Sequence, residues 1–187
     1  MVDQQIPHYD VIIIGSGSIG TPTAYYLTKA GIKVLVIDQG ASVGQGSNKR
    51  AIGGVRATHS DPAKIRLSLR SLEIFSTWKE NFGDDIEWYK GGYTFIAYRE
   101  EEEKTLKELT SVQKNLGLNV DWLDSKLLLD LIPDLNPINL YGGTYSPDDG
   151  SVSSLLAVHA FYRHAKASGA EFHFNEQLKN IIVSGGK

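Results

Sequence analysis

Three glycines near the start of the chain have the spacing needed to hold a diphosphate. A diphosphate lying against a main chain needs a tight turn after a strand and a position without a Cβ where phosphate oxygens approach. It also needs a third small residue where the following helix lies close to the strand. The amides and the dipole of the helix N-terminus then hold the negative charge without a lysine. We therefore expect a nucleotide diphosphate along Gly15, Ser16, Gly17, Ser18, Ile19 and Gly20.

A single acid follows at the distance expected for a ribose contact. Asp38 stands 18 residues after Gly20, at the end of an apolar segment, and can accept hydrogen bonds from both ribose hydroxyls. A carboxylate there repels a 2′-phosphate, which disfavours an NADP-type ligand. A glycine turn that serves only packing would leave Asp38 unexplained. A hydrolase nucleophile elbow is excluded because Ser16 stands where the G-x-S-x-G motif requires its first glycine.

The elements around these residues form a predicted βαβ unit. Residues 9–14 are rich in β-branched side chains without alternation, which is typical of a parallel strand buried on both faces. A helix over 23–30, ended by Gly31, and a second buried strand over 33–38 follow. The crossover between parallel strands is expected to be right-handed. The fold class is therefore α/β, with a Rossmann-like nucleotide-binding unit.

The rest of the chain is predicted to mix helices and strands. Residues 39–60 are glycine-rich and are interpreted as a long ordered loop with at most one short helical turn, and such segments are usually functional. The other predicted elements are helices over 61–82, 100–116, 125–131 and 153–168, a hairpin of strands 86–89 and 93–98, and strands over 120–123, 141–145, 171–174 and 180–183. We expect residues 1–85 and 146–187 to form the incomplete nucleotide-binding domain and residues 86–145 to begin a mixed-sheet substrate domain.

Composition excludes several classes of function. Of 187 residues, 41% are hydrophobic and 22% charged, which is typical of a folded globular chain. The net charge of −3 argues against nucleic-acid binding. The absence of cysteine excludes disulfides, thiolate zinc sites and iron–sulfur clusters, and no metal site is predicted because His159 and His164 lack zinc-pair spacing. With no secretory signal and no membrane span in the sequence, we expect a cytoplasmic protein.

The segment after Asp38 favours FAD over NAD. A simple NAD half-domain continues from its second strand into another helix and a third parallel strand, whereas a glycine-rich loop follows here. An extended flavin dinucleotide needs main chain alongside it well beyond the pyrophosphate. Gly46 and Ser47, and then residues 53–55, can supply that main chain. FAD is the better interpretation, with NAD as the alternative.

Four segments carry a resemblance that covers nearly the whole chain. They are YDVIIIGSGSIGTPTAYYLTKAGIKVLVID, GQGSNKRAIGGVRATHS, IEWYKGGYTFIAYREEEE and GGTYSPDDGSVSS. Together they resemble FAD-dependent amine oxidoreductases of the D-amino-acid oxidase superfamily, in particular the sarcosine oxidase, glycine oxidase and L-proline dehydrogenase branch. The first segment is shared with many flavoproteins, whereas the G-Y-x-F-x-A strand and the Y-x-P-x-D-G turn are more specific to this branch.

The resemblance implies FAD as the cofactor and assigns contacts to it. Outside residues 15–20 these are Asp38 and Gln39 at the adenosine end, Gly46 and Ser47 near the phosphates, Gly53, Gly54 and Val55 against the flavin ring, Arg56 beside the ring, and Leu178, whose main chain faces the adenine. A positive charge at Arg56 would stabilise the anionic reduced flavin, and a structural ion pair is the alternative for this residue. His59 and the turn residues Asp148 and Asp149 are interpreted as structural.

The resemblance also implies a reaction. The chain would be the N-terminal portion of an oxidoreductase that oxidises the C–N bond of a small amino acid or secondary amine, of sarcosine, glycine or proline type, by hydride transfer to flavin. Members of this family are much longer, and their later half supplies most of the substrate pocket. We therefore expect no catalytic base in this chain, no turnover by it alone, and completion by a missing C-terminal half or a partner chain. Apolar surface that the missing half would cover also predicts a homo-oligomer. The alternative is a non-catalytic FAD- or NAD-binding subunit of a multi-chain assembly.

Overall fold

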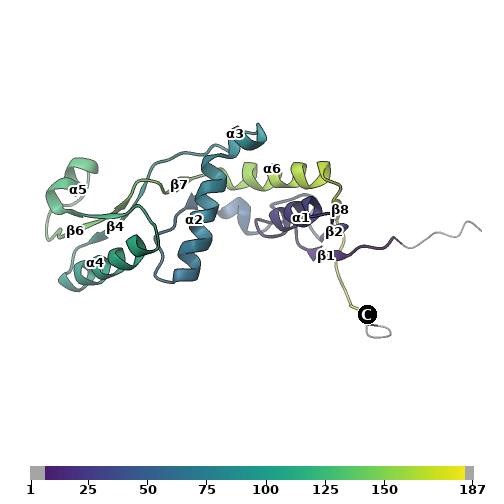
Figure 1. The fold of residues 1–187 in the computed structure, drawn as a ribbon, viewed down its shortest axis with the longest axis horizontal. Coiled ribbons are helices and arrows are strands. Elements are labelled where there is room, and N and C mark those ends of the chain that lie inside the picture. The colour runs from purple at the N-terminus through teal and green to yellow at the C-terminus, as the bar shows by residue number, and fades with distance from the viewer. Residues whose placement is uncertain (1–6, 184–187) are drawn as a thin grey trace, which may run out of the picture. The chain divides into compact units, whose positions relative to one another are not determined.

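The structure is a computed structural model that describes residues 7–183 (Figure 1). Its contacts divide the chain into two compact units. The first contains the described residues up to Ile52 and from Ser153 onward, and the second is Gly53–Val152. Residues 53–85 and 146–152, predicted with the nucleotide-binding part, make their contacts in the second unit. The functional assignment of 1–85 and 146–187 to one cofactor-binding domain stays a prediction.

The first unit is built on a parallel three-stranded sheet. β1 (Val11–Ile14), β2 (Val34–Asp38) and β8 (Glu171–Phe174) are arranged in the order β1-β2-β8, and α1 (Gly20–Lys29) connects the first two. The register pairs Ile14 with Ile37 and Asp38 with Phe174. All three carboxyl ends therefore meet at one edge. The predicted βαβ unit is confirmed.

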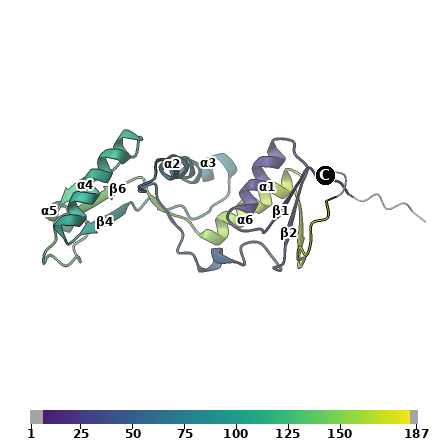
Figure 2. The same ribbon diagram turned by 90° about the horizontal axis from the view of Figure 1, so that it is seen from below.

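Two helices pack together in this unit. α1 and α6 (Ser154–Ala167) lie side by side next to the sheet (Figure 2). The ring of Tyr162 in α6 contacts Phe172 and Phe174 of β8, with centroids 4.7 and 5.9 Å apart. These contacts hold the short third strand against the helix.

The first strand departs from the prediction that both its faces are buried. A Cβ on Gly20 would lie 3.4 Å from the side chain of Ile13, so Ile13 points toward α1. Ile12 and Ile14 alternate to the opposite side and are 53% and 56% exposed. By contrast, Val34, Leu35 and Val36 of the central strand β2 are buried, as predicted.

The second unit contains an antiparallel three-stranded sheet in the order β4-β6-β5. Its strands are β4 (Tyr93–Ala97), β6 (Gly142–Ser146) and β5 (Asp121–Asp124), accompanied by α4 (Glu100–Asn115) and α5 (Ser125–Leu131). A separate two-stranded ladder joins β3 (Gly54–Val55) to β7 (Gly150–Ser151). An apolar cluster of Ala57, Leu72, Leu118 and Val120 lies in this unit. Leu72 belongs to α2 (Pro62–Ser76), which explains why this helix is part of the second unit.

Two predicted strands are absent from the described structure. Residues 86–89 form no hairpin with β4, because Tyr89 exchanges two main-chain hydrogen bonds with Ser151 and Gly92 donates to the carbonyl oxygen of Asp149. β4 pairs instead with β6. Residues 180–183 form no strand, and the chain from residue 176 to residue 183 is irregular.

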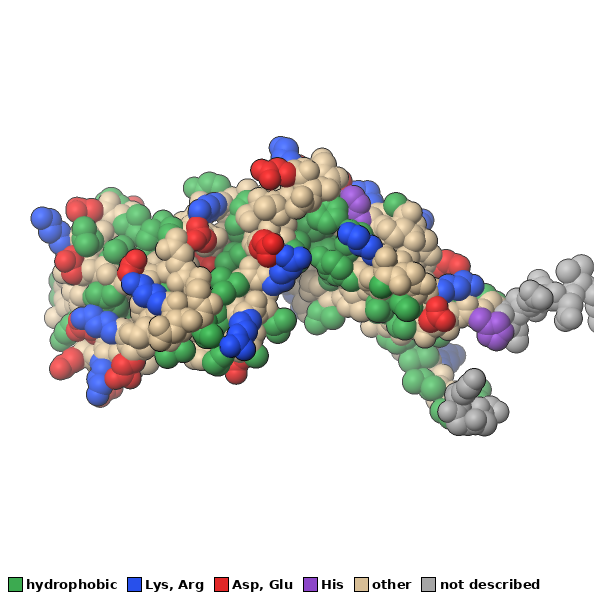
Figure 3. Space-filling model, viewed as in Figure 1, with side chains coloured by type: hydrophobic (Ala, Val, Ile, Leu, Met, Phe, Trp, Pro, Cys, Tyr) green, Lys and Arg blue, Asp and Glu red, His purple; other side chains and the backbone are tan. Residues whose placement is uncertain are grey.

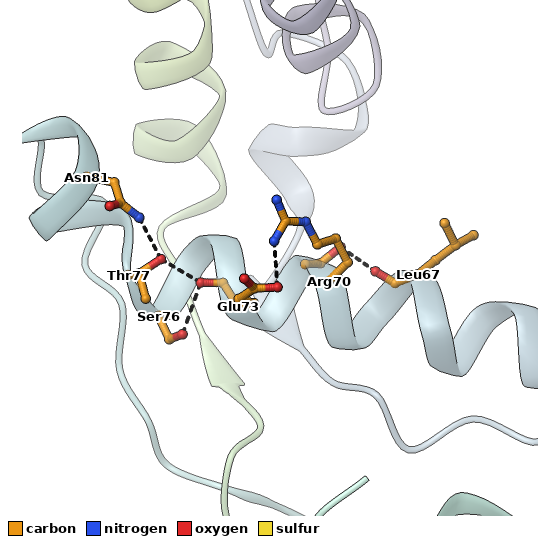
Figure 4. Close-up of polar contacts among 7 residues, drawn as sticks. Leu67, Arg70, Glu73, Ser76, Thr77 and Asn81 are labelled. Atoms are coloured by element: carbon orange, nitrogen blue, oxygen red, sulfur yellow. Dashed lines mark hydrogen bonds and ion pairs between the residues drawn. The ribbon is translucent and has the colours of Figure 1, made fainter. Parts of the chain in front are cut away.

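The helix predicted over 61–82 is interrupted at Thr77, between α2 and α3 (Trp78–Phe82). Figure 4 shows the side chains at this point: the carbonyl oxygen of Glu73 accepts from the hydroxyls of Ser76 and Thr77, at 3.2 and 2.8 Å. The Thr77 hydroxyl in turn accepts from the side chain of Asn81 at 2.9 Å. The main chain of Thr77, with φ −103° and ψ 9°, departs from helical values, so α2 ends at this residue.

Surface charge is mixed in sign. On the face shown in Figure 3, acidic and basic side chains are interspersed over both units, in accord with the net charge of −3. Among the helices of residues 7–183, none combines the length and the apolar character needed to cross a bilayer.

Candidate dinucleotide-binding site

Each of the three glycines in the turn after β1 has a different main-chain environment. Gly15 has a φ of 101°, a left-handed conformation that side chains with a Cβ rarely adopt, and it turns the chain out of β1. At Gly20 a Cβ would lie 1.9 Å from the carbonyl oxygen of Gly15, so only glycine lets α1 approach the strand this closely. At Gly17 a Cβ would meet only the side-chain oxygen of Asn48, at 3.2 Å. The predicted tight turn at Gly15 and the predicted close approach at Gly20 match the structure, and the predicted approach of a phosphate at Gly17 stays a prediction.

The start of α1 presents amides that the protein leaves open. Ile19 is the N-cap, and no side chain caps the helix. Within residues 7–183, the main-chain N–H groups of Gly17, Ile19 and Gly20 have no protein acceptor. The amides of Ser16 and Ser18 do have one, in the side chains of Asp38 and Asn48. An anion at this helix N-terminus would therefore be held by the amides of Gly17, Ile19 and Gly20 and not by those of Ser16 and Ser18.

Asp38 is held in place by three hydrogen bonds. Its Oδ2 accepts from both the amide and the hydroxyl of Ser16, each at 2.6 Å, and its Oδ1 accepts from the amide of Gly40 at 2.7 Å. Burial alone would raise the pKa of this carboxyl, but the bonds from Ser16 and Gly40 more than offset that effect and lower it. A carboxylate has about four acceptor positions, so the ionised group keeps capacity for a ribose hydroxyl.

These residues line one cavity of about 780 Å³ within the first unit. Its walls come from the ends of β1 and β2, the loop through residue 48 and the segment after β8. The predicted site residues that it brings together are Gly15, Ser16, Gly17, Ser18, Ile19, Gly20, Asp38, Gln39, Gly46, Ser47 and Leu178. The volume lies within the range of about 300–1,000 Å³ that is usual for small-molecule sites.

Sequence reasoning missed other residues of this cavity. They are Ile14, Ile37, Gly40, Gly44, Gln45, Asn48, Glu176 and Gln177. Asn48 lies in a short 3-10 helix, η1 (Ser47–Arg50), and its polar side chain next to the predicted Ser47 was the available signal. Glu176 reaches the cavity because its amide donates to the carbonyl oxygen of Asp38 at 3.0 Å. No local pattern in the sequence indicates that contact.

The remaining predicted cofactor residues, Gly53, Gly54, Val55 and Arg56, lie in the second unit. A Cβ on Gly53 would lie 1.9 Å from the carbonyl oxygen of Val152, and its φ is 78°, so this glycine is required by the β3–β7 ladder itself. Their predicted place against the flavin ring stays a prediction.

Arg56 stands beside a smaller cavity of about 240 Å³ within the second unit. Its guanidinium donates to the carbonyl oxygen of Thr58 and lies over the rings of Tyr93 and Phe95, at 5.6 and 5.0 Å. His59 also lines this cavity, and burial followed by the charge of Arg56 lowers its pKa. His59 is therefore favoured as a neutral group near a fixed positive charge.

Asp149 has a structural environment, as predicted. It is fully buried, and its carboxylate accepts from the amide of Ala57 at 2.9 Å and from the hydroxyl of Thr58 at 3.3 Å. Burial raises its pKa, although these bonds oppose the shift. Asp148 pairs instead with Lys90 at 2.6 Å. The turn thereby fixes the segment that carries Arg56.

A parallel βαβ unit with a glycine turn, open helix amides and an acid at the end of the second strand defines a dinucleotide-binding protein of the Rossmann type. Residues 10–187 match the model of one family, described as FAD dependent oxidoreductase. The chain belongs to this FAD-dependent oxidoreductase family, also called DAO. The predicted resemblance, the α/β fold class and the choice of FAD over NAD are confirmed.

Individual relatives agree with this membership. The chain is 30% identical over 177 residues to monomeric sarcosine oxidase of Streptomyces avermitilis, covering 92% of this chain and 44% of that protein. It is similar in structure to L-proline dehydrogenase of P. horikoshii, with 28% identity, a TM-score of 0.89 and coverage of 96% and 48%. Glycine oxidase of Bacillus cereus gives 27% identity, a TM-score of 0.79 and coverage of 95% and 49%. The chain thus spans about half the length of these relatives.

Proposed function

We propose that this chain is the FAD-binding portion of an oxidoreductase that oxidises the C–N bond of a small amino acid or secondary amine. The observation that carries the proposal is the cleft of the first unit, where the open helix amides and Asp38 fit the diphosphate and the ribose of an ADP group. The relatives named above act on sarcosine, proline and glycine according to their names, which supports an amine substrate of this size. The alternative of a non-catalytic subunit is not favoured by this family membership.

The residues of the cleft divide the binding of the cofactor between them. The amides of Gly17, Ile19 and Gly20 donate to the diphosphate, and the carboxylate of Asp38 accepts from the adenosine ribose. Ser16 and Gly40 keep that carboxylate ionised and oriented. Gly46, Ser47 and Leu178 contribute walls of the same cavity.

In this proposal the positive charge of Arg56 stabilises negative charge on the flavin ring. One amino group of its guanidinium is engaged by Thr58, and its other N–H groups have no acceptor within residues 7–183. Bound FAD would supply the acceptor for the hydride that leaves the carbon next to the amine nitrogen. A fixed cation beside that acceptor stabilises the charge that develops on it. The cytoplasmic location, the partner chain and the homo-oligomer stay predictions.

The test uses the full-length protein. We expect it to purify with flavin absorbance and that absorbance to be bleached anaerobically by sarcosine, glycine or proline. A protein without flavin absorbance, whose melting temperature rises with NAD and not with FAD, would refute cofactor and function together. A flavin-loaded protein that none of these amines reduces would refute the substrate class alone.

A further inference from the structure

We propose that Asp149 is the buried countercharge of Arg56, joined to it through the hydroxyl of Thr58, and that it limits how strongly Arg56 attracts negative charge. This inference rests on the proposed role of Arg56 beside the flavin. Asp149 and Thr58 act through Arg56, so both are positioning residues in this proposal. All three residues belong to the second unit.

Asp149 is a buried acid that the proposed reaction does not use. Its side chain is 0% exposed. The carboxylate accepts from the main-chain amide of Ala57 at 2.9 Å and from the hydroxyl of Thr58 at 3.3 Å. Burying a carboxylate costs free energy unless hydrogen-bond donors and an opposite charge compensate it. The segment after β3 supplies these donors, and Arg56 on the same segment carries the opposite charge.

The hydroxyl of Thr58 connects the carboxylate to the guanidinium. A threonine hydroxyl has one hydrogen to donate and two acceptor positions. Its hydrogen goes to Oδ2 of Asp149, and its oxygen accepts from Nη1 of Arg56 at 3.4 Å. The same Nη1 also donates to the main-chain oxygen of Thr58. Asp149 therefore orients the hydroxyl, and the hydroxyl presents a lone pair to Arg56, so that a charged group stands at each end of the chain of bonds.

The charged groups around Asp149 leave Arg56 as its partner. Burial raises the pKa of Asp149, and its hydrogen bonds and the charge of Arg56 oppose that shift. His59 lies further along the same segment, and burial followed by the charge of Arg56 lowers its pKa, which favours the neutral ring. On the turn itself, Lys90 is exposed and pairs with Asp148 at 2.6 Å. The charge of Asp149 is therefore balanced by Arg56 rather than by Lys90.

This pairing affects how Arg56 acts on a flavin. An ionised Asp149 cancels part of the field of Arg56, because opposite charges in a buried environment interact strongly. The flavin of the proposed reaction must accept a hydride and afterwards give up its electrons. An uncompensated cation would favour the reduced flavin more strongly. Asp149 therefore lowers the reduction potential relative to Arg56 alone.

The first test measures the pairing and does not depend on the cofactor. The full-length protein is labelled with carbon-13 at its aspartate carboxyls, and the pKa of Asp149 is followed by NMR. We expect Arg56→Gln to raise this pKa, with acid dissociation weakened by about tenfold, because the charge that favours the carboxylate is lost. Thr58→Val should weaken acid dissociation by about threefold, and Thr58→Ser, which keeps the hydroxyl, should restore it. Lys90→Gln is the matched control: it removes a cation bonded to the neighbouring Asp148, and it should change the acid dissociation of Asp149 by less than about twofold.

The second test measures the reduction potential of the bound flavin against a reference dye. Asp149→Asn keeps an acceptor for the amide of Ala57 and removes the charge. We expect the reduced flavin to be favoured by about tenfold, which raises the two-electron potential by about 30 mV. The difference from the wild type should disappear as pH falls through the pKa of Asp149, where the wild-type carboxyl is itself neutral. A role limited to holding the main chain predicts the opposite sign, because a displaced Arg56 would stabilise the reduced flavin less.

The two measurements separate the pairing from the proposed function. If Arg56→Gln leaves the titration of Asp149 unchanged, or Lys90→Gln shifts it equally, the pairing is overturned. A potential that falls or stays constant in Asp149→Asn overturns the effect on the flavin. If this variant does not fold, Thr58→Val replaces it and should raise the potential, with Thr58→Ser at the wild-type value. A protein without flavin refutes the proposed function, and the NMR titration then still decides whether Asp149 and Arg56 are paired.

Discussion

Replacing Gly20 with alanine tests the closest main-chain approach in the cleft. The new Cβ would lie 1.9 Å from the carbonyl oxygen of Gly15 and 3.0 Å from its carbonyl carbon. Real Cβ atoms essentially never come within 3.0 Å of a non-bonded heavy atom, so the start of α1 must move by at least 1.1 Å. The position of a Cβ is fixed by the main chain, and the atoms that it would meet are main-chain atoms of Gly15, so no change of rotamer can relieve the clash.

The expected cost follows from that displacement. Overpacking of this kind typically costs about 1–3 kcal/mol. The gain of alanine over glycine within a helix is about 1 kcal/mol, and it is smaller at a first helical residue. We expect a net loss of about 1–2 kcal/mol, which lowers the melting temperature by roughly 2–8 °C for a domain of this size. FAD affinity should fall by about tenfold or more, because the amides of Gly17, Ile19 and Gly20 leave hydrogen-bonding position.

The assay compares the full-length variants by thermal melting and FAD titration. Gly31→Ala is the control, since it lies in the same unit outside the cavity and a Cβ there meets nothing within 4 Å. Its φ of 83° makes alanine strained, so this variant should lose stability and still bind FAD like the wild type. If Gly20→Ala binds FAD as tightly as the wild type, or Gly31→Ala loses as much affinity, close approach of α1 to β1 does not position the site.

Three further substitutions test individual carboxylates. Asp38→Asn should weaken ADP binding by about tenfold and remove the preference for ADP over 2′-deoxy-ADP, and a retained preference in calorimetry would argue against a ribose contact. Burial raises the pKa of Asp149, so the contribution of this group to the free energy of unfolding is complete below the pKa of the unfolded state and is lost as pH rises through the pKa of the folded state. Urea unfolding across that pH window should show the loss in the wild type. It should not show the loss in Asp149→Asn, whose side chain can still accept from the amide of Ala57. Asp61 caps α2 by accepting from the amide of Lys64 at 2.9 Å, so Asp61→Ala should cost about 1 kcal/mol in urea unfolding, and an unchanged midpoint would show that the cap contributes nothing.

The part of the site that could be predicted is the part determined by neighbouring residues. Gly15 and Gly20 are required by features within six residues, a positive φ at Gly15 and the close approach of Gly20 to the carbonyl oxygen of Gly15. Asp38 could be predicted because a buried strand has a definite end. Patterns among residues this close in the sequence can be recognised from the sequence alone.

The part that could not be predicted depends on partners far along the chain. Tyr89 pairs with Ser151 rather than with β4, although glycines that resemble a hairpin turn lie between Tyr89 and β4. Asn48 reaches the glycine turn from a loop 30 residues later. Even the local break at Thr77 was not predicted, because the hydrophobic periodicity of the sequence runs through this residue.

The position of β2 explains why these distant contributions converge. It is the central strand of the parallel sheet, and Asp38 is its last residue. On one side the Asp38 carboxylate holds Ser16, and on the other the register with Phe174 sets the main chain of Asp38 beside that of Glu176. One residue therefore joins both walls of the cleft. For this reason Asp38→Asn should weaken adenosine and ADP binding alike, because both ligands carry the ribose.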